Sequence, residues 1–94
     1  MATYFLFGKY SPDAIREISA ERTEKAKALI KRYGGEFKSA YALLGEHDLV
    51  LIVDLPDTGQ AMKTSVALSK LLGISFSTSP AVSDREFDNA MEDI

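Results

Sequence analysis

Residues 49–55 read Leu-Val-Leu-Ile-Val-Asp-Leu, and residues 36–44 read Glu-Phe-Lys-Ser-Ala-Tyr-Ala-Leu-Leu. Between them, residues 45–48 read Gly-Glu-His-Asp, a composition that favours a tight reversal of the chain. Two such runs around a turn predict a β-hairpin. The hairpin decides the fold because its second strand is apolar on both sides apart from Asp54.

The segments on either side of the hairpin predict further strands and helices. Residues 3–10 are rich in aromatic side chains and predict a strand. Residues 12–33 carry apolar side chains at helical spacing, which predicts a helix, jogged near 18–20, that ends at a glycine pair. Residues 58–72 predict a second helix, and residues 74–82 predict a strand in which serines alternate with larger side chains.

The predicted order is therefore strand, helix, strand, strand, helix, strand. Two strand–helix–strand units with right-handed crossovers form a four-stranded antiparallel sheet with both helices on one face. We expect an α+β fold of this ferredoxin-like βαββαβ type, in a single domain over residues 1–94. Residues 84–94 predict a short acidic C-terminal helix, because five acidic residues stand there against Arg85 alone.

The sheet face away from the helices is expected to be apolar. Strands 3–10 and 49–55 do not alternate polar with apolar residues, as half-exposed antiparallel strands do. Such a face would exceed the few hundred Å² of apolar patch that soluble monomers tolerate. We therefore expect a homodimer through this open sheet face, a dimeric α+β barrel, with higher oligomers left open. The alternative is that residues 84–94 fold back over the sheet with Phe87 and Met91 inward.

A symmetric hairpin turn sorts the residues of its strands between the two faces. It places Tyr41 opposite Ile52 and Ser39 opposite Asp54 on the face that enters the dimer. The opposite face receives the small Ala40 and Ala42, onto which helices can pack closely, together with Lys38. In the first predicted helix, Arg22 occupies a position where an apolar residue is expected.

A carboxylate at Asp54, inside the dimer, requires a partner because burying it alone costs several kcal/mol. The candidate partners are on the first strand: Lys9, Tyr4 and Tyr10. Two interpretations follow. One is a satisfied network at the interface, and the other is a small-molecule site whose ligand-binding candidates are Ser39, Tyr41, Asp54 and Lys9.

The hairpin turn contains the one histidine of the chain. Gly45 permits a positive φ and Asp48 can accept backbone hydrogen bonds, so both have a structural explanation. Histidine titrates near neutral pH, so His47 is a candidate acid or base, with Tyr41 and Asp54 as further catalytic candidates. One histidine and no cysteine per chain are a thin ligand set, even doubled across a dimer, and we expect no metal and no cofactor.

Composition limits the remaining classes of function. The net charge is −3 over 94 residues, and the acidic excess lies at the C-terminal end, so no nucleic-acid partner is expected. No apolar stretch approaches the roughly 18–20 residues that cross a bilayer, so we expect no membrane association and a cytoplasmic location. The absence of cysteine excludes disulfides and thiolate catalysis. The glycines do not have the spacing of a phosphate-binding loop.

A resemblance covers nearly the whole chain. Its residues are Tyr4, Gly8-Lys9-Tyr10 with Ser11-Pro12, Gly34-Gly35, Gly45-Glu46-His47-Asp48 and Leu55-Pro56-Asp57. In these the chain resembles the GYD-domain family, but His47 stands where the family has its signature tyrosine. The resemblance implies a dimeric α+β barrel and brings no established activity. Gly45 and Asp48 before an apolar strand are also similar to the effector-binding domain of feast/famine regulators, a domain that oligomerises and binds amino acids.

The sequence thus predicts a homodimeric module that binds a small ligand without established catalysis. One alternative is a cofactor-free enzyme, isomerase-like or monooxygenase-like, in which His47, Tyr41 or Asp54 moves a proton on a small apolar substrate. The other is an effector-sensing domain, similar to that of feast/famine regulators, which works beside a separate DNA-binding chain. An enzyme needs a cavity in which polar groups converge.

Overall fold

The computed structural model describes the whole chain, residues 1–94, and its elements follow the predicted order. Four strands form one antiparallel sheet: β1 (Ala2–Tyr10), β2 (Glu36–Ala42), β3 (Leu49–Leu55) and β4 (Ile74–Ala81). They are arranged in the order β2-β3-β1-β4, so the two most apolar strands lie at the centre. The ferredoxin-like α+β fold is confirmed.

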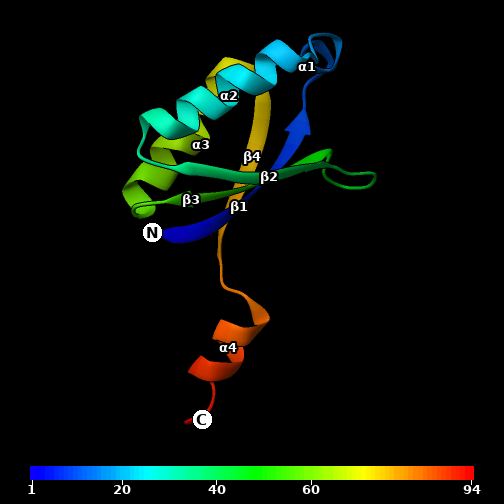
Figure 1. Cartoon of the computed structure of the whole chain (residues 1–94). Helices are drawn as coiled ribbons and strands as arrows, with labels where there is room; N and C mark the ends of the chain where they lie inside the picture. Colours follow the sequence, from blue (N-terminus) through cyan, green and yellow to red (C-terminus); the bar gives the residue numbers. More distant parts are fainter.

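Four helices complete the molecule: α1 (Pro12–Arg16), α2 (Ala20–Arg32), α3 (Thr58–Leu72) and α4 (Asp84–Ala90). In Figure 1, the helices α1, α2 and α3 lie over one face of the sheet, whereas α4 projects away on the opposite side. None of the helices is long and apolar enough to cross a lipid bilayer.

The first predicted helix is two helices, separated by residues 17–19. Ser19 has extended backbone angles, with φ −161° and ψ 159°, and its side chain accepts a hydrogen bond from the Arg22 backbone N–H at 3.2 Å. This is the geometry of an N-cap, so a new helix begins after Ser19. The guanidinium of Arg22 donates to the Leu72 carbonyl at 2.6 Å, which ties the start of α2 to the end of α3.

The hydrophobic core lies between the sheet and the helices α1 to α3. Its fully buried side chains come from both layers: Leu6, Val53 and Leu55 from the sheet, and Ile30 and Leu68 from the helices. Each such side chain stabilises the fold by roughly 1.5–3 kcal/mol relative to an exposed one. Twelve buried residues form this one cluster, and none of them comes from α4.

The hairpin is paired differently from the symmetric turn predicted above. Tyr41 lies opposite Val50, not Ile52, and Ser39 lies opposite Ile52, not Asp54. Strand β2 consequently ends at Ala42 and the loop is longer than predicted. Because the shift is two residues, Ser39 and Tyr41 keep their predicted face.

The longer loop has its cause in Asp48. Its backbone N–H donates to the Gly8 carbonyl at 2.8 Å, and its carboxylate accepts the Tyr10 N–H at 2.8 Å. Asp48 is therefore joined to β1, and its carbonyl also accepts the Leu43 N–H at 2.8 Å across the loop.

A β-bulge in β2 also corrects the predicted position of Lys38. The register shifts between Phe37 and Ser39, so Lys38 has no strand partner. Phe37 then lies opposite Val53, on the helix side, and Glu36 lies opposite Asp54. A bulge leaves one extra residue unpaired and reverses the facing of the residues beyond it.

Candidate functional site

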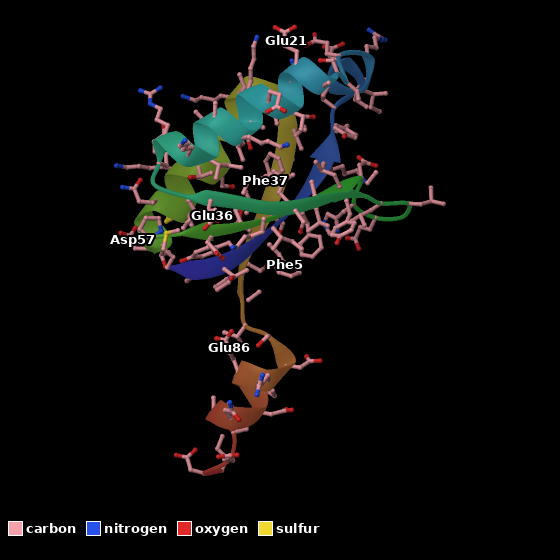
Figure 2. The ribbon with its side chains drawn as sticks, in the orientation of Figure 1. Phe5, Glu21, Glu36, Phe37, Asp57 and Glu86 are labelled. Carbon is pink, nitrogen blue, oxygen red and sulfur yellow. The ribbon has the colours of Figure 1, made fainter.

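The sheet face turned away from α1 to α3 is a candidate interaction surface, which we call the open face. Strand pairing assigns it these residues: Thr3, Phe5, Phe7 and Lys9 from β1, Glu36, Ser39 and Tyr41 from β2, Val50, Ile52 and Asp54 from β3, and Ser75, Ser77, Ser79 and Ala81 from β4. Figure 2 shows Phe5 on this side of the sheet and Phe37 on the side of the helices. The rings of Phe5 and Phe7 have centroids 6.2 Å apart, and the ring of His47 lies 5.2 Å from that of Phe7.

Helix α4 does not cover the open face, so the predicted alternative of a C-terminal lid is wrong. No residue of α4 is buried. The apolar side of the C-terminal segment is exposed to solvent, with Phe87 at 53% and Met91 at 40%. The charged residues of this segment, which exceed its apolar ones in number, agree with its position away from the body.

The carboxylate of Asp54 has partners other than those predicted. It accepts a hydrogen bond from the Thr3 hydroxyl at 2.7 Å, and the Lys38 ammonium lies 3.5 Å from its other oxygen. Tyr4 is in the core cluster and Tyr10 packs against it, so neither reaches the open face. Lys9 lies six residues from Thr3 on β1, or roughly 20 Å away.

The structure does not bring the four predicted ligand-binding residues together. Ser39, Tyr41 and Asp54 lie along neighbouring strands of the open face. Asp54 and Lys9 lie at opposite ends of the sheet, because Asp54 is opposite Thr3 and Lys9 is opposite Ser75, and the Lys9 ammonium donates to the Glu46 carbonyl at 3.4 Å.

The three catalytic candidates do not converge either. His47 packs against Phe7, and the neighbouring carboxylate of Asp48 is engaged with a backbone N–H of β1. Tyr41 lies opposite Val50, and Asp54 lies four residues farther along β3, roughly 13 Å from Val50. No group of three or more histidine, cysteine or acidic side chains is gathered anywhere in the chain. In the turn, Gly45 has φ 145°, a conformation that favours glycine.

A second candidate site is an apolar pocket on the other side of the sheet, which sequence reasoning missed. It has a volume of about 210 Å³, and 12 of its 15 lining residues are hydrophobic. We call it the helix-side pocket. Its residues include Ile18 and Ala26 from the helix layer, and Phe37, Ala40, Ala42 and Leu51 from the sheet.

The pocket exists because α2 begins only at Ala20 and leaves part of β2 uncovered. Ala40 and Ala42 face the helix layer yet remain exposed, so the prediction that helices pack closely on them is wrong. Two sequence signals were present: the small residues of β2 and the jog of the first helix. Their meaning depends on the distance between α2 and β2, which no sequence pattern specifies.

Arg22 is the one charged residue that lines the helix-side pocket. Its guanidinium donates to the Leu72 carbonyl at 2.6 Å and to the Glu17 carboxylate at 2.8 Å, and 25% of its side chain is exposed. The other polar residues of the lining are Ser19 and Thr23, together with the hydroxyl-bearing Tyr10 and Tyr41; Tyr41 is the one predicted site residue that lines this pocket. The arrangement can hold an apolar body and one anionic group.

These features define a small ferredoxin-like α+β domain with an uncovered apolar sheet face and one apolar pocket beneath its helices. The chain belongs to the GYD domain family, whose model matches residues 4–91. No curated protein matches the chain significantly in sequence.

Solved structures of transcriptional regulators share the fold. The leucine response regulatory protein of Mycobacterium tuberculosis matches at 12% identity and a TM-score of 0.58, over 87% of this chain and 51% of that one. An AsnC-family regulator from Agrobacterium tumefaciens matches at 18% identity and a TM-score of 0.58, over 88% of this chain and 51% of that one. A feast or famine regulatory protein of M. tuberculosis, complexed with L-methionine, matches at 16% identity and a TM-score of 0.58, over 90% of this chain and 55% of that one. The chain thus spans about half the length of these regulators.

Proposed function

We propose that this chain is a homodimeric module that binds a small molecule. The observation that carries the proposal is the uncovered apolar centre of the open face, where the half-buried Phe5, Phe7 and Ile52 lie side by side on β1 and β3, beside the serines of β4. Specific protein interfaces bury about 800 Å² on each partner. A second copy of the same face removes these side chains from water.

The dimer gives the polar residues of the open face a role. Asp54 is bonded to Thr3 and lies near Lys38, so its charge is compensated before it enters an interface. Ser39 and Tyr41 lie farther along the open face, opposite Ile52 and Val50, as contacts to the second sheet or to a ligand held between the sheets. Replacing Asp54 with Asn should weaken the dimer, because it removes one of the two anionic partners of Lys38, the other being Glu36.

Sedimentation velocity tests the dimer. The wild-type chain should sediment as a dimer at micromolar concentration, and Phe7→Lys should sediment as a monomer, because a charge would be buried in the interface. Met62→Lys is the matched control, since Met62 is 65% exposed on α3. A wild-type monomer at this concentration, or a dimer that persists in Phe7→Lys, would contradict the proposal.

An effector-sensing domain is the second candidate function. It is favoured by the match of almost the whole chain to about half of each regulator, one of which was solved with L-methionine. In this case the DNA-binding part belongs to another chain. Titration of the purified chain with L-methionine, followed by sedimentation, tests this function: a change in oligomeric state supports it, and no binding at millimolar ligand contradicts it.

A cytoplasmic location and the absence of a nucleic-acid partner stay predictions. The absence of cysteine supports the cytoplasmic location, and the net charge of −3 supports the absence of a nucleic-acid partner. Retention on a heparin column at physiological salt would contradict the second.

A further inference from the structure

The helix-side pocket indicates which class of small molecule the chain takes. We propose that it binds a small hydrophobic monocarboxylate, with the apolar body over Ala40 and Ala42 and the carboxylate at the guanidinium of Arg22. The inference rests on the ligand-binding half of the proposed function and is independent of dimerisation.

The size of the pocket limits the ligand. Typical pockets for drug-sized molecules measure about 300–1,000 Å³, and this one measures about 210 Å³. An apolar cavity of about 150 Å³ holds benzene. A single aromatic ring, or a chain of about six carbons with its head group, therefore fits.

The lining sets the polarity of the ligand body. Ala40 lies opposite the buried Leu51 on the helix side of β2, where the other strands are covered by helices. Ala40 and Ala42 are nevertheless exposed, and Ile18 above them is 60% exposed. A ligand between these residues would remove all three from water, at about 25 cal/mol per Å² of apolar surface.

Arg22 sets the charge of the head group. Its side chain is held in place by the Leu72 carbonyl at 2.6 Å, so the guanidinium is oriented before a ligand arrives. Arginine stays protonated in proteins and binds carboxylates through paired N–H groups. No acidic residue lines the pocket to neutralise this charge from within.

The ion pair between Arg22 and Glu17 shows that the guanidinium of Arg22 binds a carboxylate in this position. The Glu17 oxygen lies 2.8 Å from the guanidinium, although 61% of the Glu17 side chain is exposed. A pair formed by so exposed a carboxylate contributes little to stability, with a median of about 0–1 kcal/mol. A ligand carboxylate that also buries an apolar body can replace Glu17 at this position.

Calorimetric and NMR titrations of the full chain with four probes test the proposal. Hexanoate and phenylacetate should bind, with amide shifts at Ala26, Ala40 and Ala42. Hexan-1-ol and hexylamine should bind about tenfold to a hundredfold more weakly, because a hydrogen bond to a charged group contributes that much. Equal affinity for the acid and the alcohol would overturn the assignment of Arg22.

Three variants and one control variant separate the contributions of the pocket lining, Arg22 and Glu17. Ala40→Leu should abolish binding of all probes by filling the pocket, whereas Met62→Leu, on the outer surface of α3, should leave binding unchanged. Arg22→Gln should reduce the affinity for hexanoate to that for hexan-1-ol. Glu17→Gln should raise the affinity for hexanoate, and it keeps the test valid if Arg22→Gln loosens the tie between α2 and α3.

The outcomes distinguish this inference from the proposed dimer. Hexanoate binding by the monomeric Phe7→Lys variant would support the pocket whatever becomes of the dimer. Amide shifts confined to Phe5, Phe7 and Ile52 would place the ligand between the sheets and overturn the inference. Binding of no probe at millimolar concentration would also overturn it.

Discussion

Asp48 ties the hairpin loop to β1 through both its side chain and its backbone N–H. Its carboxylate accepts the Tyr10 N–H at 2.8 Å, and its backbone N–H donates to the Gly8 carbonyl at the same distance. A hydrogen bond to a charged group contributes about 1.5–3 kcal/mol. Asp48→Ala should lower the free energy of unfolding by that amount in urea titrations. Glu46→Ala, in the exposed part of the same loop, should change it by less than about 0.5 kcal/mol, and equal effects would contradict this role.

Gly8 is required by close packing in the core. A Cβ atom at this position would lie 2.5 Å from the Leu49 Cδ2 atom and 2.9 Å from Ile74 Cγ2 and from Phe76 Cε1. Gly8→Ala should therefore destabilise the fold by about 1–3 kcal/mol, because the neighbouring side chains must leave their positions. Gly59→Ala is the control, since its nearest contact is a side-chain oxygen at 3.3 Å. Comparable urea midpoints for the two variants would contradict the prediction.

Single residues show what the sequence could and could not predict. The faces of Tyr41, Ser39 and Asp54 followed from the period of two along a strand, and they survive the change in register. The partners of Asp54 could not be predicted, because Lys38 reaches it only through a bulge. A bulge is a local change of register without a sequence signal of its own in this strand.

At the scale of elements, removing an N-cap should have different effects in α3, which packs against the sheet, and in α4, which projects from the body. Asp57 caps α3, where it accepts the Gln60 N–H at 2.8 Å, and Ser83 caps α4, where it accepts the Glu86 N–H at 3.2 Å. Asp57→Ala should lower the free energy of unfolding by about 1 kcal/mol. Ser83→Ala should leave it unchanged, because α4 buries nothing against the body. Chemical denaturation measures both, and an equal loss would show that α4 is part of the cooperative unit.

The elements themselves were largely predictable. Aromatic and apolar runs around a turn located β1, β2 and β3, alternation located β4, and helical spacing located α3. The helix-side pocket was not predictable, although the jog that opens it was. Its existence depends on how far α2 stands from β2, which is decided by packing across the whole core.

At the scale of the whole molecule, hydrogen exchange in α4 tests whether this helix makes no stabilising contact with the body. Isolated helices shorter than about 12–15 residues are marginal in water, and α4 has seven residues. In the monomeric Phe7→Lys variant, the amides of α4 should exchange with solvent at close to unfolded rates, whereas those of β1 and β3 should be protected. Hydrogen exchange read by NMR measures both sets. Protection of α4 in the monomer would contradict the arrangement described here.

The extra residue in β2 has a consequence for length variation in this protein. Since Lys38 has no partner in the ladder, a chain without it keeps Phe37 over the helices, where the Lys27 ammonium lies 4.9 Å from its ring. Loss of Ala40 would also close the bulge and leave Phe37 opposite Val53, but it would move Ser39 to the helix side and Lys38 to the open face. Gene variants one codon shorter should therefore be tolerated at Lys38, and a deletion at Ala40 should weaken the dimer by placing a lysine opposite Ile52.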